Sequence, residues 1–383
     1  MLLSAITVVI SLIYGWLFVD YIIGWCQLKD HRMKKDVSEL STQISILISA
    51  RNEEEHIENC LYHISKQDYP KHLFEIIVID DHSTDRTIEI IELCKEKLNL
   101  NNLSIIKLDE MGGEIFGKKE AIKAGINSSK YDLILVTDAD CIAGPKWVST
   151  TIDYYEDAHP KLISGPVGCF EGNSLFEKMQ CLEIMGLGGS GAAAMSIKRP
   201  NMCNGGNLAY LKETFREVEG FEGFESYSSG DDEFLMHKIA KKYPNDIHFL
   251  KSQDCIVDTY AKATLSGFLT QRKRWVSKST KYKNVHSTVT AWIVLLFNMI
   301  FLLNLILSFS KGIYEAYVFQ IAIKFILELI FLYLVTGFFK KQQLLKWFIP
   351  TQLCHIIYVV FIAFYGNIGG YKWKDRVHVS RTY

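Results

Sequence analysis

Four short clusters of polar residues have the side chains needed to hold a phosphate-bearing substrate and to move a proton. In chain order they are Ser49-Ala50-Arg51-Asn52-Glu53, Asp138-Ala139-Asp140, Gly230-Asp231-Asp232 and Gln271-x-x-Arg274-Trp275. Carboxylates can bind a divalent cation or accept a proton, and an arginine can pair with phosphate. Each cluster alone is a weak signal, but their order and spacing together indicate one reaction site.

The pair Asp138 and Asp140 ends the apolar run LILVTDAD. Side chains at positions i and i+2 of an extended chain point the same way, so both carboxylates can reach one cation. Mg²⁺ or Mn²⁺ prefers such carboxylates together with phosphate oxygens. The alternative is a solvated turn or a helix cap before Pro145, since aspartate is common in both. Both interpretations stay open.

Two more acidic clusters have a structural explanation beside a functional one. Asp85 suits the N-cap of a helix that starts at Arg86, which leaves Asp80 or Asp81 to accept an N–H from a nucleotide base. Asp231, Asp232 and Glu233 precede a helical pattern, where the helix dipole favours acids. Asp232 could equally be a general base for an acceptor hydroxyl.

The cluster around Arg274 lies shortly before an apolar segment. A basic cluster beside a membrane is attracted to anionic headgroups, which would account for Arg272, Lys273, Lys278 and Lys281. This alternative does not require Gln271 or Trp275.

Short apolar runs alternate with helical patterns between residues 44 and 137. Such alternation predicts an α/β fold with a parallel open sheet covered by helices on both faces, whose ligands bind beyond the carboxyl ends of the strands. Asn52, Asp81 and Asp138 each follow a run directly. The predicted strands are 44–49, 74–80, 103–108 and 131–137, and the predicted helices are 56–66, 86–98 and 118–126.

Apolar segments flank this region. Residues 2–19, 291–309, 313–339 and 347–365 are candidate membrane spans, and the third contains the charged residues Glu315, Lys324 and Glu328. The first segment has no basic residue before it and lysines and Arg32 after it, which predicts an uncleaved anchor with residue 29 onward in the cytosol. The formal net charge of −1 gives no support for nucleic-acid binding.

The set of motifs resembles the family 2 glycosyltransferases, inverting enzymes with a GT-A fold, and most closely the membrane members with a Q-x-x-R-W motif. These include ceramide glucosyltransferase-like enzymes and the hyaluronan, chitin and cellulose synthases. The resemblance covers about residues 40–285. Arg51 departs from it by replacing a tyrosine that stacks on uracil, and Asp231 replaces a more frequent glutamate.

The resemblance implies a role for each matching residue. Asp232 would be the catalytic base, and Asp138 and Asp140 would hold Mg²⁺ or Mn²⁺ on the diphosphate. Asn204-Gly205-Gly206-Asn207 resembles the acceptor-side loop. The implied nucleotide and substrate residues are Arg51, Asn52, Glu53, Asp81, Lys118, Asp138, Gln271, Arg274 and Trp275.

The predicted organisation is an anchor over residues 1–28, a cytosolic GT-A domain over 29–285, a transmembrane block of two to three helices over 286–370 and a basic tail over 371–383. The expected protein is an integral membrane protein, in the cell membrane if bacterial. It would transfer a sugar from a nucleotide-sugar donor, with UDP as the favoured nucleotide, to a membrane-associated lipid or glycan acceptor.

Three alternatives remain. The first is a processive polysaccharide synthase of the same family, and the second is a non-catalytic membrane protein that binds nucleotide sugars. The third, a dehydrogenase, rests only on Gly186-x-Gly188-x-x-Gly191, which follows a helical rather than a strand pattern. We expect the small-residue stretch 186–195 to form a flexible segment near the membrane instead.

Overall fold

The computed structural model describes residues 1–111, 117–224, 229–278, 284–308, 314–366, 369, 371–374 and 376–378. The chain forms two compact units, and each is described by itself. The sheet unit comprises Leu28–Phe170 and Met202–Tyr260. The helix unit comprises Met1–Gln27, Glu171–Asn201 and Ala261–Tyr383.

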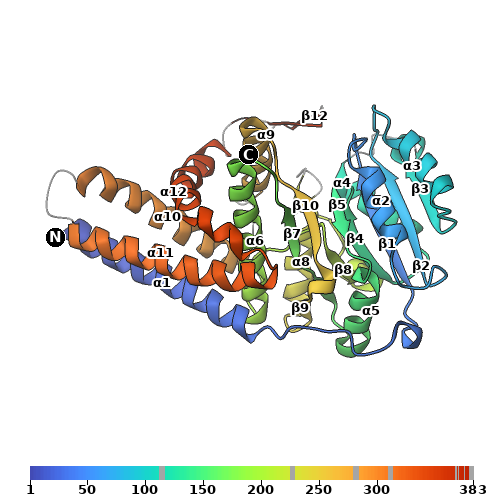
Figure 1. Cartoon of the computed structure of the whole chain (residues 1–383), viewed down its shortest axis with the longest axis horizontal. Helices are drawn as coiled ribbons and strands as arrows, with labels where there is room; N and C mark the ends of the chain where they lie inside the picture. Colours follow the sequence, from blue (N-terminus) through green and yellow to red (C-terminus); the bar gives the residue numbers. More distant parts are fainter. Residues whose placement is uncertain are drawn as a thin grey trace. The chain divides into compact units, whose positions relative to one another are not determined.

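The sheet unit is built on a seven-stranded sheet in the order β3-β2-β1-β4-β8-β6-β9 (Figure 1). The strands are β1 (Ile44–Ala50), β2 (Phe74–Asp80), β3 (Leu103–Lys107), β4 (Leu133–Asp138), β6 (Leu162–Ser164), β8 (Leu208–Leu211) and β9 (Ile247–Phe249). The predicted α/β open sheet is confirmed. The first four strands in this order are parallel, as expected, but β8 runs antiparallel to both β4 and β6. The sheet is therefore mixed.

Helices cover both faces of the sheet because the strands are apolar on both sides. On one face Ile44, Ile46 and Ile48 pack in a common core with α2, α3 and α5. On the other face α4 approaches so closely that a Cβ on Gly125 would lie 3.2 Å from Leu47 Cδ1. The bounds are α2 (Ile57–Ser65), α3 (Thr87–Lys97), α4 (Lys118–Ser128) and α5 (Trp147–Ala158).

The remaining elements of the sheet unit complete its second half. A three-stranded sheet has the order β5-β10-β7. Its strands are β5 (Cys141–Ala143), β7 (Val167–Phe170) and β10 (Val257–Tyr260), and two helices, α7 (Lys212–Glu217) and α8 (Asp231–Lys242), lie between β8 and β9 in the chain. The N-terminus of α8 carries the predicted base.

The register of the central strands places the polar clusters at one edge. Ala50 of β1 lies opposite Asp80 of β2, and Ser49 lies opposite Asp138 of β4. The strand order also reverses at β1, since β2 and β3 follow on one side and β4 on the other. Such a switch point is where open α/β sheets bind ligands.

The helix unit contains four helices long and apolar enough to cross a membrane, namely Leu2–Gln27, Val285–Ser308, Tyr314–Phe338 and Gln342–Tyr365. Three of these helices lie in the C-terminal part of the chain, where two to three were predicted. Figure 1 shows α1 and α11 running alongside each other. The helices of the unit are α1 (Leu2–Gln27), α6 (Leu175–Ser196), α9 (Leu265–Val276), α10 (Val285–Ser308), α11 (Tyr314–Phe338) and α12 (Phe348–Tyr365), and a hairpin follows with β11 (Tyr371–Trp373) and β12 (Arg376–His378).

The charged residues inside α11 do not interrupt it. Lys324 Nζ lies 2.5 Å from Glu328 Oε1, and both side chains are buried. The Tyr14 hydroxyl of α1 donates a second hydrogen bond to Glu328. Because the two charges neutralise each other and face other helices, α11 can be one continuous apolar helix.

The small-residue stretch is helical, so the prediction of a flexible segment is wrong. Gly186–Gly191 lie within α6, which also rules out the strand-to-helix turn that a dinucleotide fingerprint requires. The small residues let neighbouring helices approach closely. A Cβ on Gly189 would lie 2.6 Å from Val335 of α11, and one on Gly24 of α1 would lie 2.4 Å from the Ala193 carbonyl oxygen.

Candidate active site

Lys118 connects two of the predicted acidic clusters. Its Nζ lies 2.5 Å from Asp138 Oδ1 and 3.2 Å from Asp231 Oδ2. Lys118 opens α4, Asp138 closes β4 and Asp231 opens α8, so three distant segments meet at this ammonium group. Burial by itself would lower the pKa of Lys118, but the carboxylates of Asp138, Asp231 and Asp232 raise it above its usual value. The lysine is therefore positively charged.

Asp232 holds a loop from another part of the chain. Its Oδ2 accepts a hydrogen bond from the Gly205 N–H at 3.0 Å, and its Oδ1 accepts one from the Glu233 N–H at 2.8 Å. The second bond satisfies a donor in the first turn of α8, where the helix dipole also favours an acid, as the structural explanation predicted. The first bond brings the loop 204–207 against the acidic cluster, which helix capping does not require.

The glycines of this loop lie where a side chain would intrude. A Cβ on Gly205 would lie 3.2 Å from Lys118 Nζ, and one on Gly206 would lie 3.0 Å from Cys141 Sγ. The Thr137 hydroxyl, at the end of β4, donates to the Gly206 carbonyl at 2.8 Å. Gly205 and Gly206 are thus part of the site although they were absent from the predicted site residues. The Gly-Gly pair was the available signal.

Asn207 connects several buried segments through its side-chain hydrogen bonds. Its Oδ1 accepts from Trp147 Nε1 at 3.0 Å, while its Nδ2 donates to the carbonyl oxygens of Pro166 and Cys255. These bonds connect β8, α5 and two loops inside the buried core. The loop with the two glycines therefore has a rigid base.

The predicted metal ligands lie together. Ligand atoms of Asp138, Asp140 and Cys141 are all within 4.8 Å of one another. Two partly exposed carboxylates fit a hard cation such as Mg²⁺ or Mn²⁺. The Cys141 thiol does not fit it: burial, with the nearby charges of Asp140 and Asp138, raises the pKa of Cys141 well above its usual value, and hard cations prefer oxygen.

The loop after β1 is tied to the loop after β2. Arg51 is buried, and its Nη1 donates to the carbonyl oxygens of Asp81 at 2.6 Å and His82 at 2.8 Å. Asn52 Oδ1 accepts from the Thr84 N–H at 2.8 Å, and the Glu53 N–H donates to Thr87 Oγ1 at 2.7 Å. These three residues hold the shape of the switch-point edge, and their contact with a nucleotide stays a prediction.

Asp85 joins the same loops, close to the helix start that was predicted for it. Its carboxylate accepts from the N–H groups of Thr87 and Glu54. Burial alone would raise the pKa of Asp85, but these hydrogen bonds lower it. The prediction that Asp85 is the N-cap is wrong, because α3 begins at Thr87 and its N-cap is Arg86, although the Asp85 carboxylate accepts from the first N–H of the helix.

Asp80 and Asp81, the two candidates to accept an N–H from a nucleotide base, differ in their contacts. Asp81 Oδ1 accepts from the Gly117 N–H at 3.0 Å and lies 3.2 Å from His82 Nδ1. Asp80 Oδ2 accepts from the Ser83 N–H, while its buried Oδ1 has no hydrogen-bond partner in the described part of the chain. Burial raises the pKa of Asp80. Asp80 therefore joins Asp81 as a candidate acceptor for a base N–H.

In the helix unit, α9 carries Gln271, Arg274 and Trp275. Arg272 lies between these residues in the sequence, and one interpretation assigned it to lipid headgroups. Its side chain is only 1% exposed. Its Nη2 donates to Glu183 Oε2 of α6 at 2.7 Å, and its Nη1 donates to Gln271 Oε1 at 3.2 Å. Its Cζ lies 4.0 Å from the centre of the Trp275 ring. The side chain thus holds two motif residues in place.

The headgroup interpretation is wrong for Arg272 and also for Lys273 and Lys278, whose side chains are buried. Lys273 Nζ lies 4.3 Å from the centre of the Tyr365 ring. Lys281, the fourth residue of that interpretation, lies outside the described residues. A short basic sequence carried no signal that would have distinguished the buried arginine from its neighbours.

The sequence agrees with two family descriptions. Residues 45–218 match Glycosyl transferase family 2, and residues 133–365 match Glycosyl transferase family group 2. The chain belongs to the family 2 glycosyltransferases. It is accordingly a glycosyltransferase, and the matched range includes both the acidic clusters of the sheet unit and the helix that carries Gln271.

Three curated relatives of this glycosyltransferase match parts of its sequence. The dolichyl N-acetyl-alpha-D-glucosaminyl phosphate 3-beta-D-2,3-diacetamido-2,3-dideoxy-beta-D-glucuronosyltransferase of Methanococcus voltae is 25% identical over 60% of this chain and 70% of its own length. The poly-beta-1,6-N-acetyl-D-glucosamine synthase of Staphylococcus aureus is 32% identical over 38% of this chain and 33% of its own. The probable glycosyltransferase YdaM of Bacillus subtilis is 37% identical over 28% and 25%. The chain thus spans about a third or less of the last two relatives.

A solved structure supports the fold. The mannosyltransferase PcManGT from Pyrobaculum calidifontis, in complex with GDP-Man and Mn²⁺, has a TM-score of 0.57. The alignment covers 92% of this chain and 96% of that one at 16% identity. The likeness therefore shows a GT-A-like fold.

Proposed function

We propose that this glycosyltransferase moves a sugar, with inversion, from a nucleoside diphosphate sugar to a lipid acceptor in a membrane. The observation that carries the proposal is the meeting of Asp138, Asp231 and Lys118 beside Asp232. This arrangement combines carboxylates for a cation, a positive charge for phosphate and a base for a hydroxyl group.

The reaction is a single displacement. The acceptor oxygen attacks the anomeric carbon, the bond from that carbon to the diphosphate oxygen breaks, and Asp232 takes the proton of the acceptor hydroxyl. A divalent cation on Asp138 and Asp140 would neutralise the departing nucleoside diphosphate. Lys118 adds a second positive charge near Asp138.

The donor remains to be identified. Asp80 and Asp81 offer acceptors for a base N–H at the edge of the sheet, which suits uracil and also suits guanine. The resemblance favours UDP, whereas the mannosyltransferase with the similar fold binds GDP-Man. UDP-sugars and GDP-mannose are therefore the first donors to compare. Roles for Gln271, Arg274 and Trp275 at the diphosphate or acceptor follow from the resemblance.

A lipid acceptor is the first choice because four helices are suited to a membrane and the Methanococcus voltae relative is named for dolichyl N-acetyl-alpha-D-glucosaminyl phosphate, a lipid-linked sugar. The proposed placement is an integral membrane protein with the sheet unit in the cytosol. The second candidate is a processive synthase, which the Staphylococcus aureus polysaccharide synthase supports.

The deciding experiment uses the full chain in lipid nanodiscs with Mn²⁺ and radiolabelled UDP-glucose, UDP-N-acetylglucosamine or GDP-mannose. Label extracted into organic solvent as one glycolipid supports the proposal, and a ladder of water-soluble polymer supports the synthase. A chelator should stop either reaction. Asp254→Asn, at an exposed position of the sheet unit, is the matched control for Asp232→Asn. Transfer that survives Asp232→Asn contradicts the assigned base.

A further inference from the structure

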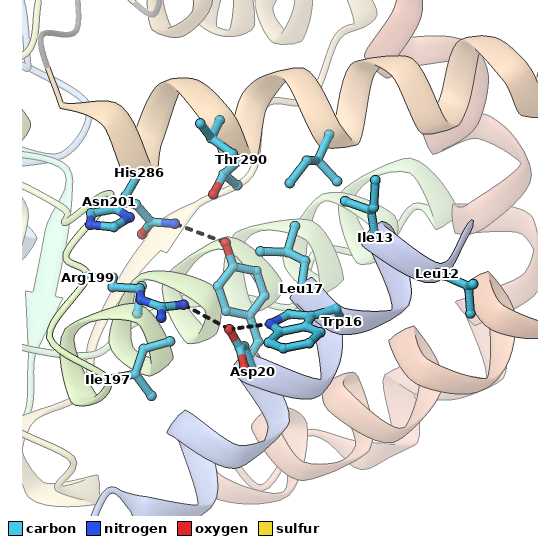
Figure 2. A pocket seen from close by; sticks show the side chains of 14 residues that line it. Leu12, Ile13, Trp16, Leu17, Asp20, Ile197, Arg199, Asn201, His286 and Thr290 are labelled. Atoms are coloured by element: carbon cyan, nitrogen blue, oxygen red, sulfur yellow. Dashed lines mark hydrogen bonds and ion pairs between the residues drawn. The ribbon is translucent and has the colours of Figure 1, made fainter. Parts of the chain in front are cut away.

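The helix unit contains a cavity whose lining includes none of the residues assigned to the transfer reaction. It has a volume of about 440 Å³ and lies between α1, the C-terminal end of α6 and the start of α10 (Figure 2). Ligand sites in proteins typically measure roughly 300–1,000 Å³. The cavity is large enough for part of an elongated small molecule.

One end of the cavity is apolar. Leu12, Ile13 and Leu17 of α1 line it together with Val289 and Ile293 of α10. Ile13 is 43% exposed and Val289 is 48% exposed, so protein covers each of them only in part. The exposed part of an apolar side chain on a helix suited to a membrane faces hydrocarbon.

The other end is polar. Arg199 Nη1 lies 3.0 Å from Asp20 Oδ2, and Trp16 Nε1 donates to the same Asp20 oxygen at 3.1 Å. Asn201 Nδ2 donates to the Tyr21 hydroxyl at 3.0 Å, and His286 also lines this end. Figure 2 shows Arg199, Asn201 and His286 toward one end of the cavity and Leu12 and Ile13 toward the other.

The polar end could bind an anion. A guanidinium carries five N–H donors, and the hydrogen bond to Asp20 occupies Nη1. The Arg199 side chain is 52% exposed, and the neighbouring Lys198 is also exposed. Asp20 opposes this charge through Nη1, so an anion would be held by the N–H donors of Arg199 on its other nitrogens.

The two ends follow the direction of the helices. Asp20 and Tyr21 lie in the second half of α1, and His286 lies in the first turn of α10, so these polar residues of the cavity come from facing ends of the two helices. Leu12 and Ile293 lie further along the apolar stretches. In a membrane, the polar end of the cavity would lie at the bilayer surface and the apolar end within the hydrocarbon. A phospholipid has the same arrangement of a polar headgroup and apolar chains.

We propose that this cavity binds an anionic glycerophospholipid of the bilayer. Its phosphate would interact with Arg199 and His286, and one acyl chain would lie along Ile13, Leu17, Val289 and Ile293. The inference rests on the proposed membrane placement and not on the transfer chemistry, so lipid binding is measured without any nucleotide sugar.

The test is native mass spectrometry of the full chain, released from detergent after titration with phosphatidylglycerol. Diacylglycerol with the same chains serves as the ligand without phosphate, and glycerol 3-phosphate serves as the ligand without chains. We expect one phosphatidylglycerol to bind about tenfold more tightly than diacylglycerol, the difference that a charge-assisted contact provides. Glycerol 3-phosphate should not compete.

Three variants separate a ligand contact from damage to the fold. Arg199→Gln should weaken phosphatidylglycerol about tenfold, while Arg216→Gln, at an exposed arginine of the sheet unit, should leave it unchanged. Val289→Trp should fill the groove and prevent binding. Asp20→Asn keeps an acceptor for Trp16 but removes the competing charge, so it should tighten binding, whereas simple damage would weaken it.

The proposal is overturned if Arg199→Gln and Val289→Trp bind phosphatidylglycerol as the parent chain does, or if diacylglycerol binds equally well. Weaker binding in Asp20→Asn would also contradict it. A chain that binds the phospholipid but transfers no sugar would support this inference while refuting the proposed function.

Discussion

The Lys118 ammonium lies 2.5 Å from the carboxylate of Asp138, one of the two proposed metal ligands. It balances the negative charge of that carboxylate. The same ammonium also contacts Asp231 at 3.2 Å. One positive group thus links the end of β4 with the start of α8. The relationship explains how these carboxylates can lie together, since unpaired like charges at this separation would repel one another.

Lys118→Gln should raise the affinity for Mn²⁺ in the absence of nucleotide by about three- to tenfold, because the variant removes a cation that competes for Asp138. Transfer should nevertheless fall about 100-fold, since a positive charge near the diphosphate is lost. Electron paramagnetic resonance of Mn²⁺ measures the first effect and labelled product the second. Lys123→Gln, exposed on the same helix, should change neither. Unchanged or weaker Mn²⁺ binding in Lys118→Gln would contradict competition between lysine and metal.

Asp232→Asn should lower the rate of transfer by about 1,000-fold, the scale of a lost general base. Asparagine keeps an oxygen for the Gly205 N–H, so the loop 204–207 should stay in place. Binding of the nucleotide sugar, measured by calorimetry, should change less than about threefold, because the base is used only in the transition state. A loss of affinity equal to the loss of rate would indicate that Asp232 acts on the donor.

Glu183→Gln should destabilise the helix unit by about 3 kcal/mol, because it leaves the buried Arg272 guanidinium without its carboxylate. The double change Glu183→Leu with Arg272→Leu should recover much of this loss in a thermal unfolding assay, since it removes both charges. Transfer should stay low in the double variant, because Gln271 and Trp275 lose their contacts with Arg272. Recovery of both stability and transfer would mean that the pair only stabilises the fold.

Glu156 should make the stability of the sheet unit depend on pH. Burial alone would raise the pKa of Glu156, but hydrogen bonds from Lys35, Ser41 and Thr42 lower it to about 2. A glutamate in the unfolded chain has a pKa of about 4.3, so the folded state gains stability above that pH and loses it as the pH falls toward 2.

Glu156→Gln should therefore cost about 1–2 kcal/mol at pH 7, an amount reduced by solvent screening, and almost nothing near pH 2. Denaturant unfolding followed by tryptophan fluorescence at several pH values measures this difference. Asp157→Asn, which removes the exposed partner of Lys34, should have a much smaller effect. An equal cost of Glu156→Gln at all pH values would exclude a role for its charge.

Much of the architecture follows from local patterns. The runs FEIIVID and LILVTD are apolar at most positions without alternation, a pattern typical of a strand covered on both faces, and the predicted strand 74–80 has the observed bounds. Asp80 and Asp138 fall at the ends of those runs, so their place at one edge of a parallel sheet follows from the pattern alone. The apolar helices follow likewise from length and composition.

The antiparallel course of β8 did not follow, because strand direction depends on where the preceding loop lies. The loop 204–207 lies beside the end of β4, so β8 starts at that edge and runs back along it. Periodicity describes which faces of a strand are apolar and carries no information about its direction.

What the sequence determined by itself was the set of reactive groups, the open sheet whose edge carries the first clusters, and the helices suited to a membrane. What only the tertiary structure decided was which groups meet: Lys118 with Asp138 and Asp231, Asp232 with Gly205, and Arg272 with Glu183. The physical reason is that local periodicity reports the surroundings of one segment, whereas hydrogen bonds and ion pairs depend on distances between segments. Sheet order and helix packing set those distances.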